Sequence, residues 1–192
     1  MSGRKERERD AKGETSLDAA HLRPSIHPTY ARLLAAELKR RGFGEAALIE
    51  GTRVARAQLL EEDRFLSFEQ FRRLAVRGME LSGEPWLGLD VGRSTQISSH
   101  GPLGYAMVAS ADVRQALSVI ERYSGLRLQV AGFSVEHRDG RVQLCIEDVL
   151  GWGDLEEYIS LHIIGAISLV LETVSGTHLP DTRVAFSYSA PA

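Results

Sequence analysis

The segment from Leu155 to Val174 constrains the fold most, because it reads as a helix that is apolar on nearly all sides and ends at Gly176. Such a helix has to be buried, either in a protein or in a membrane. Polar residues interrupt its apolar run and favour burial in protein over a membrane span. These residues are Ser160, His162, Ser168, Glu172 and Thr173. We therefore expect the helix at the centre of a domain, with Asp154 and Glu157 capping its start.

The chain before residue 87 predicts a helical layer that follows a polar arm. Residues 1–24 mix Arg and Lys with Glu and Asp and carry few apolar side chains, so we expect a disordered arm. Apolar spacing then predicts a helix from about residue 28 to Gly42 and a short helix over Glu45 to Ile49. A third helix is predicted to begin with the capping box formed by Ser67 and Gln70.

The residues from 87 onward predict a small antiparallel sheet. The segment LGLDVG at 87–92 reads as a short strand closed by glycine. A hairpin follows, with a turn at 139–140 and apolar residues alternating over 133–136 and 143–146. We expect a last strand over 184–188, where apolar and polar residues again alternate.

Between the first strand and the hairpin, a glycine-rich turn at 101–104 leads into an amphipathic helix. Ser110 is expected to cap this helix, with Asp112 in its first turn and Gly125 at its end. Together these signals predict an α+β fold, in which an N-terminal helical layer and a small antiparallel sheet pack against two long helices.

Composition predicts a cytoplasmic protein with no membrane partner. The net charge of −3 gives no reason to expect a surface that coats nucleic acid. Cys145 is the single cysteine, which excludes an internal disulfide and a multi-cysteine zinc site and fits a reducing cytosol. The first residues hold no apolar core of a signal peptide.

The sequence offers no constellation that indicates catalysis, a metal or a cofactor. The segment GPLGYAMVAS lacks the lysine and hydroxyl residue of a phosphate loop and the third glycine of a dinucleotide fingerprint. The six histidines form no HExxH pattern, and no GxSxG elbow occurs. We therefore expect no catalytic residue, no metal and no bound cofactor.

A set of amphipathic residues is compatible with a small-molecule pocket, because such pockets are mostly apolar with a few placed polar groups. These candidate ligand-binding residues stand at the ends of predicted elements or on largely apolar helices. They are Tyr105, Met107, Arg122, Tyr123, Arg127, Trp152, Tyr158 and His162.

An ordered series of motifs resembles the N-terminal, arabinose-binding-like domain of AraC/XylS-type bacterial transcription regulators. The series comprises GLDVG after Glu84-Pro85-Trp86, the turn Gly101-Pro102-Leu103-Gly104-Tyr105, the Ser110 cap with Ala116-Leu117, and Arg122-Tyr123. The hairpin and the long apolar helix complete it. The resemblance spans about residues 25–188.

The resemblance implies that residues 25–192 form an effector-binding and self-associating domain, expected as a homodimer that answers to a small molecule of unknown identity. Regulators of this class bind DNA through a separate C-terminal domain with two helix-turn-helix motifs. Nothing after Tyr188 could supply those motifs, so we expect DNA binding only through polypeptide outside this sequence.

Three alternatives stay open at this point. A ligand-free interaction module would use the long helix or a sheet edge for dimerisation. A small hydrolase or isomerase would use His162 with Glu156 or Glu157, although neither carboxylate falls on the helix face of His162. For the fold, other AraC-type regulators suggest a cupin-like all-β barrel, against which the helical periods before Gly83 and after Asp154 argue.

Overall fold

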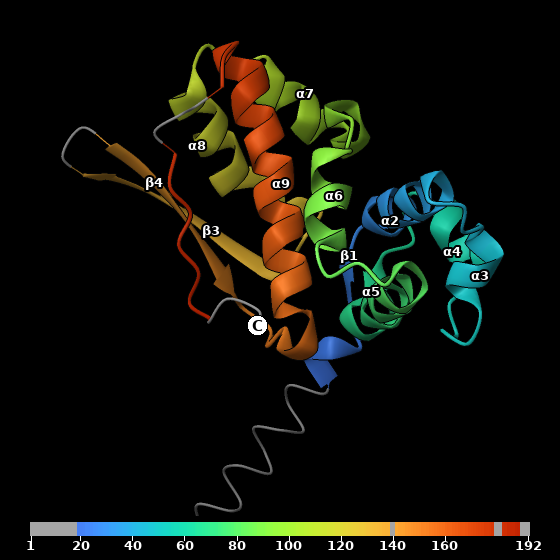
Figure 1. Cartoon of the computed structure of the whole chain (residues 1–192). Coiled ribbons are helices and arrows are strands. Elements are labelled where there is room, and N and C mark those ends of the chain that lie inside the picture. Colours follow the sequence, from blue (N-terminus) through green and yellow to red (C-terminus); the bar gives the residue numbers. More distant parts are fainter. Residues whose placement is uncertain (1–18, 139–140, 179–181, 189–192) are drawn as a thin grey trace, which may run out of the picture.

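The computed structural model describes residues 19–138, 141–178 and 182–188 (Figure 1). Helices dominate, and the strands form two separate two-stranded antiparallel sheets. The predicted α+β class is therefore confirmed, and the cupin-like barrel is wrong for the part of the chain described.

The N-terminal layer consists mainly of helices that bury one apolar face each. Its elements are β1 (Pro24–Ile26), α2 (Thr29–Arg40), α3 (Glu45–Ile49), α4 (Arg56–Leu60), β2 (Leu66–Ser67) and α5 (Phe68–Ser82). The predicted capping box is confirmed, because Ser67 N donates to Gln70 Oε1 (3.0 Å) and Gln70 N donates to Ser67 Oγ (3.2 Å). The sequence did not predict α4 or the β1–β2 pair, which are too short to show a period.

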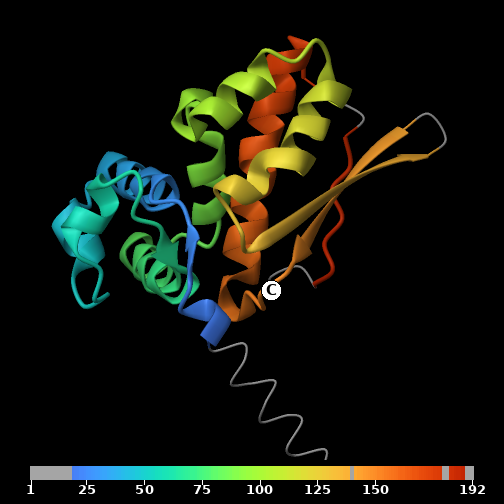
Figure 2. The same ribbon diagram turned by 180° about the vertical axis from the view of Figure 1, so that it is seen from behind.

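The remaining elements surround the long C-terminal helix. They are α6 (Leu87–Arg93), α7 (Pro102–Val108), α8 (Val113–Tyr123), β3 (Ala131–Arg138), β4 (Arg141–Asp148) and α9 (Glu156–Ser175). Figures 1 and 2 show α9 in the middle of the molecule, where it packs against α6, α7 and α8. The prediction that this helix is central and ends at Gly176 is confirmed, since Gly176 adopts the left-handed conformation of a helix C-terminus (φ 68°).

The closest contact between helices is the crossing of α6 and α9, where glycines let the two backbones touch. A β-carbon built on Gly88 would overlap the carbonyl oxygen of Tyr158, and one on Gly92 would overlap that of His162. On the other helix, a β-carbon on Gly165 would lie 2.8 Å from Leu89 O and 3.1 Å from Arg93 N. Any side chain larger than hydrogen at these positions would force the helices apart.

The expectation of a strand over 87–92 is therefore wrong, because this segment is helix α6. Gly88 and Gly92 are spaced four residues apart, so helix α6 places them on one face, where both meet the backbone of α9. Arg41 ties α6 to the N-terminal layer through Asp90 (Nη2–Oδ2 2.6 Å) and also binds the buried Glu37 (Nε–Oε1 2.7 Å).

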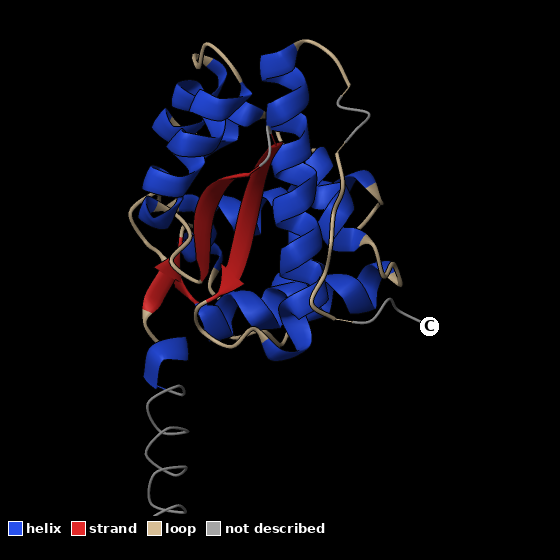
Figure 3. Cartoon of the chain, turned by 90° about the vertical axis from the view of Figure 1, so that its left-hand side faces the viewer, coloured by secondary structure: helices blue, strands red, loops and turns tan. Residues whose placement is uncertain are grey.

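The predicted hairpin is confirmed in its strands and its register. Phe133 pairs with Ile146 and Val135 with Leu144. Its turn at Asp139-Gly140 lies outside the described residues. Figure 3 shows the two strands in front of the helices, and β3 contacts α8.

Several local expectations are corrected. The glycine-rich segment after Gly101 is the helix α7 and not an open turn. Asp112, and not Ser110, caps α8, because its carboxylate accepts from Gln115 N (2.8 Å). Asp154 does not cap α9; it binds Arg72 of α5 instead (Nε–Oδ1 2.8 Å).

The segment 182–188 forms no strand, which contradicts the predicted last strand there. Its apolar residues do alternate, but no strand lies beside it in register to complete a ladder. Figure 1 shows this segment (red) passing beside α9 and the hairpin.

On length and composition alone, the helical stretch Gly153–Ser175 could cross a membrane. In this structure, however, α9 contacts other helices along its length and only Thr173 among its residues is classed as exposed. Its apolar character therefore serves packing within the protein.

We predict that Gly92→Ala lowers the free energy of unfolding by about 3 kcal/mol, because the added methyl group overpacks a contact between two backbones. The measurement is urea unfolding followed by circular dichroism. Gly125→Ala is the matched control, since a β-carbon there meets nothing within 4 Å. We expect the control to stay within about 0.5 kcal/mol of the parent; equal effects of the two substitutions would contradict the role given to the crossing.

Candidate functional site

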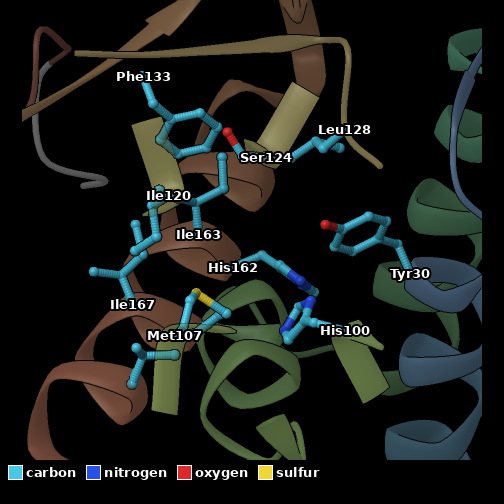
Figure 4. Close-up of a pocket in the computed structure, with 12 residues that line it drawn as sticks. Tyr30, His100, Met107, Ile120, Ser124, Leu128, Phe133, His162, Ile163 and Ile167 are labelled. Atoms are coloured by element: carbon cyan, nitrogen blue, oxygen red, sulfur yellow. The ribbon is translucent and has the colours of Figure 1, made fainter. Parts of the chain in front are cut away.

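A pocket with a cavity volume of about 60 Å³ lies where α7, α8 and α9 meet α2 and β3 (Figure 4). It falls between the two apolar clusters of the protein and takes wall residues from both. Its wall is mostly apolar. The lining residues are Tyr30, His100, Met107, Ile120, Ser124, Leu128, Phe133, His162, Ile163, Ala166, Ile167 and Val170.

Polar groups gather at one end of this cavity. Tyr30 of α2, His100 just before α7 and His162 of α9 face one another, with ring centroids 6.0 Å apart for Tyr30–His100 and 5.7 Å for Tyr30–His162 (Figure 4). Both ring nitrogens of His162 are buried and have no hydrogen-bond partner among the residues that the structure describes. Because a buried polar group without a partner costs about 1–3 kcal/mol, this arrangement calls for an explanation.

Burial keeps these groups uncharged near neutral pH. It lowers the pKa of His162 to about 3, with a further contribution from the neighbouring His100. Burial also lowers the pKa of His100 to about 4, helped by the positive charge of Arg127. For Tyr30, burial raises the pKa to about 12. The cluster therefore presents neutral imidazoles and a protonated phenol, each of which can donate and accept a hydrogen bond.

Arg127 lies beside this polar end. Its Nη2 contacts His27 Nδ1 (2.9 Å) and donates to Ser99 O (3.5 Å), while its buried Nε has no partner. Burial lowers the pKa of the Arg127 guanidinium. Burial is also the main cause that lowers the pKa of His27 to about 4, and the positive charge of Arg127 is the second cause. Within the described residues, no carboxylate forms a hydrogen bond with Arg127; the nearby Glu62 binds Arg32 instead (2.5 Å).

The structure brings some of the candidate ligand-binding residues together at the cavity. Met107 and His162 line it, Arg127 lies beside its polar end, and the ring of Tyr158 is 6.2 Å from that of His162. Trp152 is buried elsewhere in the core and donates to Val130 O (2.7 Å).

The other candidates point outward. Tyr105 is 63% exposed and Tyr123 is 48% exposed, and Arg122 is also exposed. Sequence reasoning missed Tyr30, His100 and Ser124, because they lie on segments predicted to be ordinary core helix, loop and helix end. Their shared feature is proximity in space, which has no signature in the order of residues.

No group of three or more His, Cys, Asp or Glu residues is placed to hold a metal ion within residues 19–138, 141–178 and 182–188. The three polar groups in the cavity come from different elements and have no nucleophile and base in hydrogen-bond contact. The arrangement, a mostly apolar wall with a few polar groups at one end, has the composition typical of small-molecule pockets.

Comparison with known proteins identifies the family. Residues 42–192 match the family described as "Arabinose-binding domain of AraC transcription regulator, N-term". The chain therefore belongs to the family of N-terminal regulatory domains of AraC-type transcription regulators, which are not enzymes. The expected resemblance is confirmed, and the hydrolase or isomerase alternative is wrong.

Individual relatives that match this chain are also regulators by name. An ornithine utilization regulator of Pseudomonas aeruginosa is 30% identical over 167 residues, which cover 85% of this chain and 48% of that protein. Uncharacterized HTH-type transcriptional regulators of Mycobacterium tuberculosis and Mycobacterium bovis are each 30% identical over 114 residues, covering 55% of this chain and 32% of theirs. The matched part of this chain thus spans about half the length of the first relative and 32% of the length of each of the other two.

We predict that acid destabilises the protein through its buried histidines. The folded pKa values of His162 and His100, about 3 and 4, lie below the ordinary 6.5, so the unfolded chain binds protons that the folded protein does not. Stability is then fully present above about pH 6.5 and falls as pH decreases toward 4, by about 1.4 kcal/mol per pH unit for each such histidine.

Urea unfolding at pH 7, 6 and 5 tests this prediction. His162→Gln is expected to reduce the pH slope by about 1.4 kcal/mol per unit, because it removes one titrating group. His178→Gln removes a histidine that is exposed at the surface and is the matched control. An unchanged slope in the His162 variant would show that its imidazole is not held neutral by the fold.

Proposed function

We propose that this chain senses a small molecule in the cavity between α7, α8 and α9 and transmits its binding to a DNA-binding domain outside this sequence. One observation carries the proposal: a cavity of about 60 Å³ is lined by the buried His162, whose ring nitrogens have no hydrogen-bond partner in the described part of the chain. A ligand that supplied this partner would recover the cost of the unmatched group. The membership in a family of regulatory domains supports the same function.

The proposed mechanism follows from α9, because this helix both lines the cavity and contacts α6. His162, Ile163, Ala166, Ile167 and Val170 all belong to α9, and Gly92 of α6 packs against the same helix at His162 and Ala166. A ligand that binds better to one position of α9 would therefore increase the population of that position. The change in α9 would reach α6 through the contact between the two helices. Only such a difference in affinity between two arrangements can couple the cavity to a distant domain.

Self-association of residues 25–192 is the second part of the proposal. It is supported by α9, on which Ile164 and Leu169 are only partly buried and belong to neither apolar cluster. A dimer that covered these side chains would bury apolar surface that the single chain leaves in contact with water. Gene regulation would then depend on how ligand binding alters the arrangement of two DNA-binding domains.

A cavity-filling substitution tests the sensing function. We expect a compound from a panel of sugars, amino acids including ornithine, and carboxylic acids to raise the melting temperature by several degrees. Val170→Phe should abolish this shift, because Val170 lines the cavity. Val174→Phe, the same substitution one helical turn further along α9 and outside the wall, should retain it. If no compound in the panel shifts the melting temperature, the sensing function is wrong.

Light scattering during size-exclusion chromatography tests self-association. The chain has a mass of 21.2 kDa, so a dimer has twice that mass. We expect the dimer at protein concentrations of tens of micromolar. A mass that stays at the value of one chain across that range would contradict this part of the proposal.

A further inference from the structure

The wall of the cavity selects among chemical classes of ligand, because none of its residues carries a formal charge near neutral pH. None of its lining residues is Asp, Glu or Lys, so the wall offers neither a negative charge nor a flexible ammonium group. The guanidinium of Arg127 is a formal charge that acts on both Tyr30 and His100, and among the described residues it has no hydrogen-bonded carboxylate. A ligand ammonium buried here would have no partner of opposite charge, which costs several kcal/mol.

Arg127 and the polar cluster are joined through a short stretch of backbone. Ser99 O accepts from Arg127 Nη2 (3.5 Å) and from Thr29 Oγ1 (3.0 Å). The acceptor Ser99 directly precedes the wall residue His100 in the chain. The donor Thr29 directly precedes the wall residue Tyr30. The guanidinium of Arg127 contacts Ser99 O and its charge acts on Tyr30 and His100, so it lies on the same side of the cavity as the hydroxyl and the imidazoles.

We propose, resting on the sensing function above, that the cavity binds a short aliphatic monocarboxylate, with its carboxylate at Tyr30, His100 and His162 and its alkyl chain toward Met107, Ile120 and Ile167. Figure 4 shows this division, with the rings of the first three residues converging at one end and the apolar side chains at the other. A carboxylate only accepts hydrogen bonds, and the phenol and two neutral imidazoles each have a hydrogen to donate. The positive field of Arg127 favours the anion over a neutral alcohol of the same shape.

The size of the cavity limits the alkyl chain. An apolar protein cavity of about 150 Å³ holds benzene, and an acid of about three to five carbons has about as many heavy atoms as benzene, so a cavity of about 60 Å³ admits such an acid only if the wall moves. Met107 is the adaptable element of this wall, because an unbranched thioether side chain changes shape at little cost. An aromatic acid is larger still and would require a greater movement of the wall.

Titration calorimetry on the full chain with sodium butyrate tests the proposal, with 1-butanol, n-butylammonium and ornithine as probes of the other classes. We expect butyrate to bind at least tenfold more tightly than each of the other probes. Arg127→Gln should weaken butyrate binding about tenfold or more, because it removes the positive charge beside the carboxylate. Arg138→Gln makes the same change in charge on an exposed residue of β3 and should leave binding unchanged.

A second variant tests the proposal even if the Arg127→Gln protein does not fold. Met107→Ala enlarges the apolar end and should shift the preference from butyrate toward hexanoate. If 1-butanol binds as tightly as butyrate, or if a sugar or ornithine binds in a manner that Val170→Phe abolishes, the carboxylate assignment is wrong while the sensing function holds. If no probe in either panel binds, both proposals are wrong.

Discussion

The contact of α6 with α9 through Gly88, Gly92 and Gly165 is the constraint on which the rest of the structure depends. It brings two backbones together without intervening side chains, so α9 is fixed in rotation as well as in distance. That rotation turns His162 and Val170 toward α7 and α8 and leaves Ile164 only partly covered. The cavity exists because α9 is held from one side while its other neighbours, α7, α8 and β3, meet it at a seam between two apolar clusters.

The seam explains how a largely apolar domain tolerates unmatched polar atoms. Within the described residues His162 has no partner for either ring nitrogen, and burial lowers its pKa to about 3, so the imidazole is neutral near pH 7. Native proteins match nearly all buried polar groups, so each exception calls for an explanation. The buried hydroxyl of Tyr158, also without a partner, lies on the same helix one turn earlier. The cost of these groups is consistent with a site whose stability is greatest when it is occupied.

Sequence reasoning succeeded where local patterns decide the structure and failed where partners are remote. The capping box of Ser67 and Gln70 and the register of the hairpin follow from residues a few positions apart, and both were predicted. Asp154 has the spacing of a helix cap, but Arg72, 82 residues away in sequence, takes its carboxylate. The segment at 87–92 has the composition of a short strand closed by glycine, and only the approach of α9 gives its glycines their role on a helix. For the cavity, Met107 and His162 were among the candidates, whereas Tyr30 and His100 were not.

By itself, the sequence determined the class of fold, the central place of the long apolar helix and the family, because hydrophobic period, caps and ordered motifs are written along the chain. The tertiary structure alone decided where the cavity lies, because it is assembled from α2, α7, α8, α9 and β3, and no local pattern records that these elements converge. It also decided the charge of the site, since burial and the neighbouring Arg127 set the protonation of His100 and His162, and burial is a property of packing and not of sequence order.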